Sequence, residues 1–107
     1  MLFLPPGLII EVSFSMKLRE KYGVRLSTEN FRKGTSEAAL SIDYDKRLKI
    51  VEIEYLNSDV YHYLNSNNKE WGKMIDFANK SKGLGGYVNH DFKKKHDYYK
   101  LIVLPER

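Results

Sequence analysis

The sequence predicts an α+β fold, in which a small antiparallel sheet carries two helices on one of its faces. Between residues 37 and 64, apolar side chains recur at every second position in three short runs, the period of strands with one buried face. Between residues 67 and 95 the apolar spacing changes to three and four, the period of amphipathic helices. The 107 residues are enough for one domain. We therefore expect a three-strand meander plus a C-terminal strand, with two helices packed on one face.

The first third of the chain is predicted to be an N-terminal extension, residues 1–34, that precedes the domain of residues 35–107. Within it we expect a strand or the start of a helix over residues 8–15, and a helix over residues 16–22. Residues 24–36 are rich in Ser, Thr, Asn and Gly and are therefore expected to form a linker.

The apolar start of the chain does not have the features of a secretory signal. No Lys or Arg precedes the apolar run, Pro5 and Pro6 interrupt it, and no small-residue cleavage site follows. It is also shorter than the roughly 20 residues that cross a bilayer. We expect a cytoplasmic protein without membrane attachment, and Met16 is an alternative start that would remove residues 1–15.

Three strands and a final strand follow from the alternation of apolar and polar residues. The first covers residues 37–44, with Leu40 on its apolar side, and the second covers residues 51–55. The third covers residues 60–64, and the last covers residues 98–104. Short turns between the first three strands make these pairs antiparallel.

The two helices are indicated by caps and by apolar stripes. Asn67 and Glu70 have the spacing of a capping box, and a helix stripe follows at Trp71, Met74, Ile75 and Ala78. Residues 84–86 are expected to form a loop. A second helix is predicted over residues 87–95.

An ordered set of short motifs resembles a known family. The run from about residue 36 to residue 104 resembles the KTSC domain, a module found at the C-terminus of some lysyl-tRNA synthetases and also alone. The matching features are Ile42-Asp43-Tyr44-Asp45, Val51-Glu52-Ile53-Glu54-Tyr55, Tyr61-His62-Tyr63, Ala78, Ser81-Lys82-Gly83, Tyr87-Val88-Asn89, Phe92-Lys93 and Tyr98. The resemblance implies the same fold, and RNA binding has been suggested for the family. Ser58 and Lys93 depart from it, because glycine and arginine are usual at those positions.

The charge distribution is uneven along the chain, although the net charge is only +4. Residues 17–33 hold six basic and two acidic side chains, and residues 80–107 hold seven and three. Residues 36–76 hold five basic and eight acidic side chains. Such a pattern is typical of a surface that binds polyanions. It is equally typical of basic ends that fold against an acidic middle, and the sequence leaves both interpretations open.

The leading hypothesis is a small non-catalytic module that binds RNA or another nucleic acid. Phosphates would be attracted by the lysines of the C-terminal region, which are Lys80, Lys82, Lys93, Lys94, Lys95 and Lys100. Bases would stack on nearby tyrosines, which are Tyr61, Tyr63 and Tyr87. Asn89 either caps the second helix or contacts a ligand. The lysines are also what an ordinary solvated surface carries.

The direction of Tyr61 and Tyr63 depends on the preceding turn. A two-residue loop at Asn57 and Ser58 places both tyrosines on the acidic outer face, and a three-residue loop places them in the core. Asn at the first loop position favours the two-residue turn and hence the outward direction. An outward pair would share its face with carboxylates that repel phosphate, those of Asp43, Glu52 and Glu54.

Enzymatic chemistry is not expected from these residues. The chain has no cysteine, and His62, His90 and His96 do not fall at metal-ligand spacing. We expect no catalytic residue, no metal and no cofactor. The alternative function is a protein-interaction or homo-oligomerising module that uses the Tyr61 and Tyr63 sheet face or a sheet edge.

Overall fold

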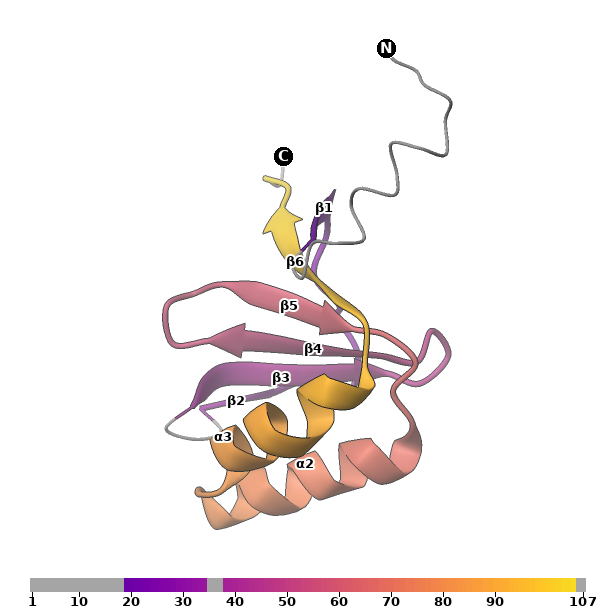
Figure 1. Cartoon of the computed structure of the whole chain (residues 1–107). Coiled ribbons are helices and arrows are strands. Elements are labelled where there is room, and N and C mark those ends of the chain that lie inside the picture. Colours follow the sequence, from indigo (N-terminus) through magenta and orange to yellow (C-terminus); the bar gives the residue numbers. More distant parts are fainter. Residues whose placement is uncertain (1–18, 35–37, 106–107) are drawn as a thin grey trace.

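The computed structural model describes residues 19–34 and 38–105, which form a six-stranded mixed sheet with helices on one face (Figure 1). The strands occur in the spatial order β1-β6-β5-β4-β3-β2. Their bounds are Glu20–Gly23 for β1, Arg32–Lys33 for β2, Ala39–Asp45 for β3, Ile50–Tyr55 for β4, Val60–Tyr63 for β5 and Tyr98–Val103 for β6. The helices are α2 (Asn68–Lys80) and α3 (Leu84–Tyr87), and α3 continues as a π-helical turn (Val88–Phe92) and a 3₁₀ turn (Lys93–Lys95). The predicted α+β class is confirmed.

The sheet is larger than predicted because residues from the N-terminal third add a strand at each edge. β1 pairs in parallel with β6, so the helix predicted over residues 16–22 is wrong for residues 20–22. β2 lies within the predicted linker and pairs antiparallel with β3. The predictions for residues 8–15 and 16–18 fall outside the described residues. Residues 20–23 form a strand because they pair with the edge of β6, and this pairing outweighs their local preference for a helix.

A β-bulge changes the phase of alternation at the start of β3. The register against β4 shifts between Ala39 and Ser41. As a result Ala39 is buried and Leu40 is 40% exposed, which is the reverse of the predicted phase. From Ile42 onward the predicted alternation is confirmed, because Ile42 and Tyr44 lie in the core.

The hairpin between β4 and β5 has a three-residue loop, Leu56-Asn57-Ser58. The Tyr55 N–H donates to the Asp59 carbonyl at 2.9 Å, and the Ser58 N–H donates to the Tyr55 carbonyl at 2.8 Å. Ser58 adopts the left-handed conformation, with φ of 76°, which completes a turn of this length. In this register Ile53 lies opposite Tyr61 and Val51 lies opposite Tyr63. The preference for outward-facing tyrosines is therefore wrong, and both side chains lie on the helix side of the sheet.

The helical layer begins where the sequence indicates. Asn67 caps α2, and Asn67 and Glu70 form the predicted capping box. The loop predicted over residues 84–86 is wrong, because α3 begins at Leu84 and buries that side chain. Gly83 allows this early start, since its φ of 92° reverses the chain directly after α2.

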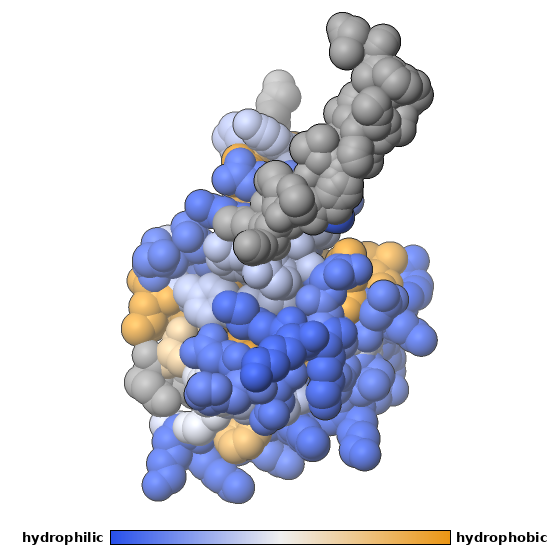
Figure 2. Space-filling model, viewed as in Figure 1, coloured by the Kyte–Doolittle hydropathy of each residue, from blue (hydrophilic) through white to orange (hydrophobic). Residues whose placement is uncertain are grey.

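The core lies between the sheet and this helical layer. It is formed mainly by Ile42, Tyr44, Val51, Ile53, Tyr63, Met74, Leu84, Val88 and Phe92. Figure 2 shows that the outward surface of the helical side is largely hydrophilic. Within residues 19–34 and 38–105, no helix has both the length and the apolar character needed to cross a membrane.

Candidate functional site

A pocket lined largely by tyrosine side chains lies on the helix side of the sheet. Its volume is about 360 Å³, at the small end of the roughly 300–1,000 Å³ that is usual for ligand pockets. We call it the tyrosine pocket; its lining residues are Tyr55, Asn57, Asp59, Tyr61, Tyr63, Lys93 and Tyr98. Four rings from three neighbouring strands thus meet at one place, because strand register aligns Tyr61 with Ile53 and Tyr63 with Tyr98.

The tyrosine rings support one another and leave Tyr61 half-buried. Tyr61 stacks on Tyr63, with ring centroids 6.3 Å apart and planes 25° apart. Tyr55 and Tyr98 meet Tyr61 edge to face, at centroid distances of 5.6 Å and 6.0 Å. Tyr63 already stacks on the Tyr61 ring, so a planar ligand in this pocket would meet rings that are packed together. Such a ligand would extend an existing aromatic stack.

The phenol groups of Tyr55, Tyr61 and Tyr63 stay protonated at neutral pH. Burial raises the pKa of Tyr55 to about 12, although the hydrogen bond between Tyr55 and Tyr63 acts in the opposite direction. Burial also raises the pKa of Tyr63, and the hydroxyl oxygens of Tyr55 and Tyr63 are 2.6 Å apart. Burial, followed by the charge of Asp59, raises the pKa of Tyr61. These three hydroxyls are therefore neutral hydrogen-bonding groups.

Lys93 brings a positive charge to the edge of this pocket. Its ammonium nitrogen lies 6.0 Å from the centroid of the Tyr98 ring. The π-helical turn that ends at Phe92 buries that ring completely and is followed at once by Lys93. Turns of this kind are rare and frequently occur at functional sites. Lys93, directly after this turn, lines the tyrosine pocket, whereas Lys95 lines a different groove.

A second groove lies between α2 and the helical segment that follows α3. Tyr87 stacks on Phe77 there, with ring centroids 5.3 Å apart. The groove is lined by Lys73, Asp76, Phe77, Lys80, Tyr87, Asp91 and Lys95. Its lysines therefore share the groove with two carboxylates, which reduces the attraction for an anion.

The site residues predicted from the sequence lie at several separate places in the structure. Tyr61, Tyr63 and Lys93 meet at the tyrosine pocket, and Tyr87, Lys80 and Lys95 line the second groove. Lys82 and Lys94 are exposed. Asn89 does not cap the second helix, whose N-cap is Gly83; it is exposed at a smaller pocket of about 190 Å³. Lys100 lies opposite Tyr61, and its ammonium pairs with Asp59 at 3.5 Å.

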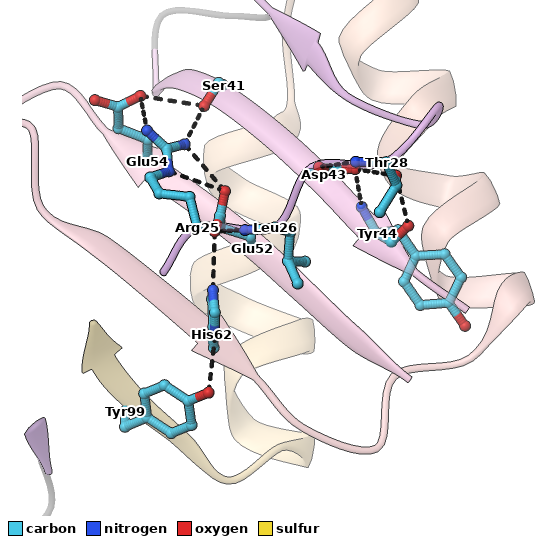
Figure 3. A network of polar contacts seen from close by, with 10 residues as sticks. All are labelled: Arg25, Leu26, Thr28, Ser41, Asp43, Tyr44, Glu52, Glu54, His62 and Tyr99. Carbon is cyan, nitrogen blue, oxygen red and sulfur yellow. Dashed lines mark hydrogen bonds and ion pairs between the residues drawn. The ribbon is translucent and has the colours of Figure 1, made fainter. Parts of the chain in front are cut away.

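The opposite face of the sheet carries a buried polar network that sequence reasoning missed (Figure 3). Arg25 reaches across this face and donates two hydrogen bonds to Glu52 Oε1, at 3.1 Å and 3.0 Å. It also donates to Glu54 at 3.2 Å and to Ser41 at 3.1 Å. Glu52 is only 1% exposed, so the face predicted to be the acidic outer face of the sheet is shielded from solvent at this residue. The burial of Glu52 by Arg25 agrees with one of the two interpretations of the charge pattern, in which a basic N-terminal region folds against the acidic middle of the chain.

The rest of the network continues through His62. Its Nε2 lies 2.9 Å from Glu52 Oε2, and its Nδ1 lies 2.8 Å from the Tyr99 hydroxyl. A neutral imidazole that carries its proton on Nε2 satisfies both contacts, with the Tyr99 hydroxyl donating to Nδ1. Burial raises the pKa of Glu52, but hydrogen bonds from His62, the Leu26 N–H and Arg25 outweigh it and hold the pKa below 4.5.

A second buried carboxylate on this face fixes the same N-terminal segment. Asp43 accepts hydrogen bonds from the hydroxyl and the N–H of Thr28, and from the Tyr44 N–H at 2.8 Å. These contacts and the Arg25 contacts hold residues 25–28 against the sheet. Among the residues that the structure describes, no group of three or more His, Asp or Glu side chains is placed to hold a metal ion. The hydrogen bonds on this face therefore attach residues 25–28 to the sheet.

No protein-family model matches the chain, and no curated protein matches it. The resemblance to the KTSC domain consequently stays a prediction from the sequence.

Proposed function

We propose that this protein is a small non-catalytic module that binds single-stranded nucleic acid, RNA in particular. One base stacks on Tyr61 in the tyrosine pocket, and Lys93 attracts a neighbouring phosphate. The observation that supports this proposal best is the presence of Tyr61 and Lys93 on one pocket. Proteins that hold single strands combine exposed aromatic rings with a cationic border in this way. The resemblance to the KTSC domain points in the same direction.

The pocket by itself gives only weak binding. Stacking of one base contributes about 1–3 kcal/mol, whereas a dissociation constant of about 1 mM corresponds to about 4 kcal/mol. A strand therefore needs further phosphate contacts to bind tightly. The exposed side chains of Lys94 and Lys95 directly follow Lys93 and offer such contacts on the helical side.

Binding of a labelled uracil-rich RNA, measured by fluorescence anisotropy over a salt series, tests the proposal. Lys93→Gln should reduce the salt slope by about 0.7, the value for one phosphate contact on a single strand. Lys46→Gln is the matched control, because it removes the same charge from an exposed residue in the β3–β4 turn, which lies outside both grooves. An equal effect of both changes would indicate diffuse attraction by the whole surface and would remove the pocket from the mechanism.

The stacking contact is tested separately. Tyr61→Leu should weaken RNA binding about 5- to 100-fold while leaving the salt slope unchanged. Tyr22→Leu serves as its control, because Tyr22 is 65% exposed on β1 and lies outside the pocket. Unchanged RNA affinity in Tyr61→Leu would rule out the proposed stacking.

A protein-interaction or homo-oligomerising module is the second candidate, and one observation favours it. Large apolar side chains are exposed where the paired strands β1 and β6 end, namely Tyr22, Val24, Val103 and Leu104. An exposed sheet edge with apolar neighbours is a surface on which another chain can add a strand. Light scattering at low and high salt distinguishes this candidate, because apolar association persists at high salt.

A further inference from the structure

A carboxylate on the rim of the tyrosine pocket is held in one place and still has free hydrogen-bonding capacity. Asp59 follows the β4–β5 loop, and its Oδ2 accepts a hydrogen bond from Asn57 Nδ2 at 3.2 Å. Its Oδ1 lies 3.5 Å from the Lys100 ammonium. An ionised carboxylate offers about four acceptor positions, so these contacts leave capacity on both oxygens. The side chain is 33% exposed and borders the pocket that Tyr61 lines.

Lys100 and Asp59 together present an ordered set of hydrogen-bonding groups beside the pocket. The ammonium is a donor, and the two carboxylate oxygens next to it are acceptors. Guanine presents the complementary set on its pairing edge, with the O6 acceptor followed by the N1–H and N2–H donors. A base stacked on Tyr61 would bring that edge toward the rim, because Tyr61 and Lys100 lie directly opposite each other on neighbouring strands.

We infer that the tyrosine pocket selects guanine, with Asp59 accepting from N1–H and N2–H and Lys100 donating to O6. This inference rests on the proposed function and names the base that the same site prefers. It also gives Lys100 a different role from the phosphate contact predicted from the sequence.

The other bases cannot match this arrangement. Uracil has one ring N–H between two carbonyl oxygens, so one oxygen would meet Lys100 and the other would face a carboxylate oxygen of Asp59. Adenine and cytosine each place a ring nitrogen acceptor beside the amino group, so one carboxylate oxygen of Asp59 would meet a lone pair. A site built to pair with particular donors rejects ligands that lack them, because its own polar groups then lose their partners.

The test compares labelled RNA heptamers that differ only at the central position of a uracil background. Guanine at that position should bind about 5- to 100-fold more tightly than uracil, the range for a two-hydrogen-bond base contact. Inosine, which keeps N1–H and lacks the 2-amino group, should fall between them. Adenine and cytosine should bind no better than uracil.

Variants identify the residue responsible. Asp59→Asn replaces one acceptor oxygen by a donor, so the preference for guanine should disappear, while binding of the all-uracil heptamer stays the same or becomes tighter because a negative charge is lost. Asp91→Asn removes an equal charge at the second groove and should keep the preference. Intact tertiary structure in each variant is verified by near-ultraviolet circular dichroism.

The possible outcomes distinguish a failure of the guanine preference from a failure of RNA binding itself. Equal binding of all heptamers, or a guanine preference that survives in Asp59→Asn, overturns the selectivity and leaves the RNA-binding module standing. Failure of every heptamer to bind removes the proposed function itself, and the selectivity with it.

Discussion

Replacement of Arg25 by methionine should strongly destabilise the fold, although Arg25 lies in a segment without regular secondary structure. The guanidinium donates two hydrogen bonds to Glu52, one to Glu54 and one to Ser41. Methionine has comparable length and keeps much of the apolar stem, so the change isolates the charged group. The Glu52 carboxylate, which is 1% exposed, then loses its cationic partner inside the protein.

The magnitude follows from how much of the pair is buried. Removing one partner of a fully buried ion pair costs about 3–5 kcal/mol, because the other charge remains desolvated. The Arg25 side chain is 31% exposed, and Glu52 keeps hydrogen bonds from His62 and the Leu26 N–H. We therefore expect a loss of about 2–3 kcal/mol, a large part of the total stability of roughly 5–15 kcal/mol for a domain. The melting temperature should fall by roughly 10–20 °C.

Urea unfolding followed by tryptophan fluorescence measures this loss directly. Trp71 is the only tryptophan, and it stacks on Tyr44 on the helix side of the sheet, away from the site of the change. Arg47→Met is the matched control, because Arg47 is exposed in the β3–β4 turn and its replacement should change the free energy of unfolding by less than about 0.5 kcal/mol. Equal stability of the Arg25 and Arg47 variants would refute the structural role of the buried network.

Two further predictions concern the pH dependence and two glycines. The pKa of Glu52 is below its usual 4.5, so its contribution to stability is complete above that pH and is lost as the pH falls through the folded-state pKa. Glu52→Gln should flatten the acid limb of the unfolding free energy in urea titrations from about pH 7 to about pH 3, and an unaltered limb would contradict this assignment. Gly72→Ala should stabilise the fold by about 0.5–1 kcal/mol, because a Cβ at this exposed position in α2 has open space around it. Gly83→Ala should destabilise it by more than about 1 kcal/mol, because φ is 92° and the Cβ would lie 2.8 Å from Phe77; thermal melts that rank the two variants in the opposite order would contradict the backbone argument.

Local patterns were sufficient to predict the central elements of the fold. The alternation of apolar residues located β4, and the capping box located the first turn of α2 at Asn67 and Glu70. Both signals depend on residues close together in the chain, so the sequence carries them directly. The same holds for β6, whose predicted span of residues 98–104 agrees with the structure to within one residue.

Features that depend on contacts between distant residues could not be predicted in this way. β1 is a strand because the edge of β6 is available to it, and that edge exists only after the sheet has formed. The direction of Tyr61 and Tyr63 depended on a single residue of loop length. Ser58 was the informative position, because a residue in the left-handed conformation completes a three-residue turn as readily as a two-residue turn.

The buried carboxylates show most clearly what a strand pattern leaves undecided. Alternation places Glu52 and Asp43 on the face opposite the core, and the structure agrees with that placement. Alternation does not say what covers that face. Residues 25–28 lie over it and supply Arg25 and Thr28 as hydrogen-bond partners. The carboxylates of Glu52 and Asp43 are therefore buried. The acidic face of a strand that is apolar on its other face can therefore be covered either by solvent or by a basic segment from elsewhere in the chain. The six basic side chains of residues 17–33 were the evidence for a covering basic segment.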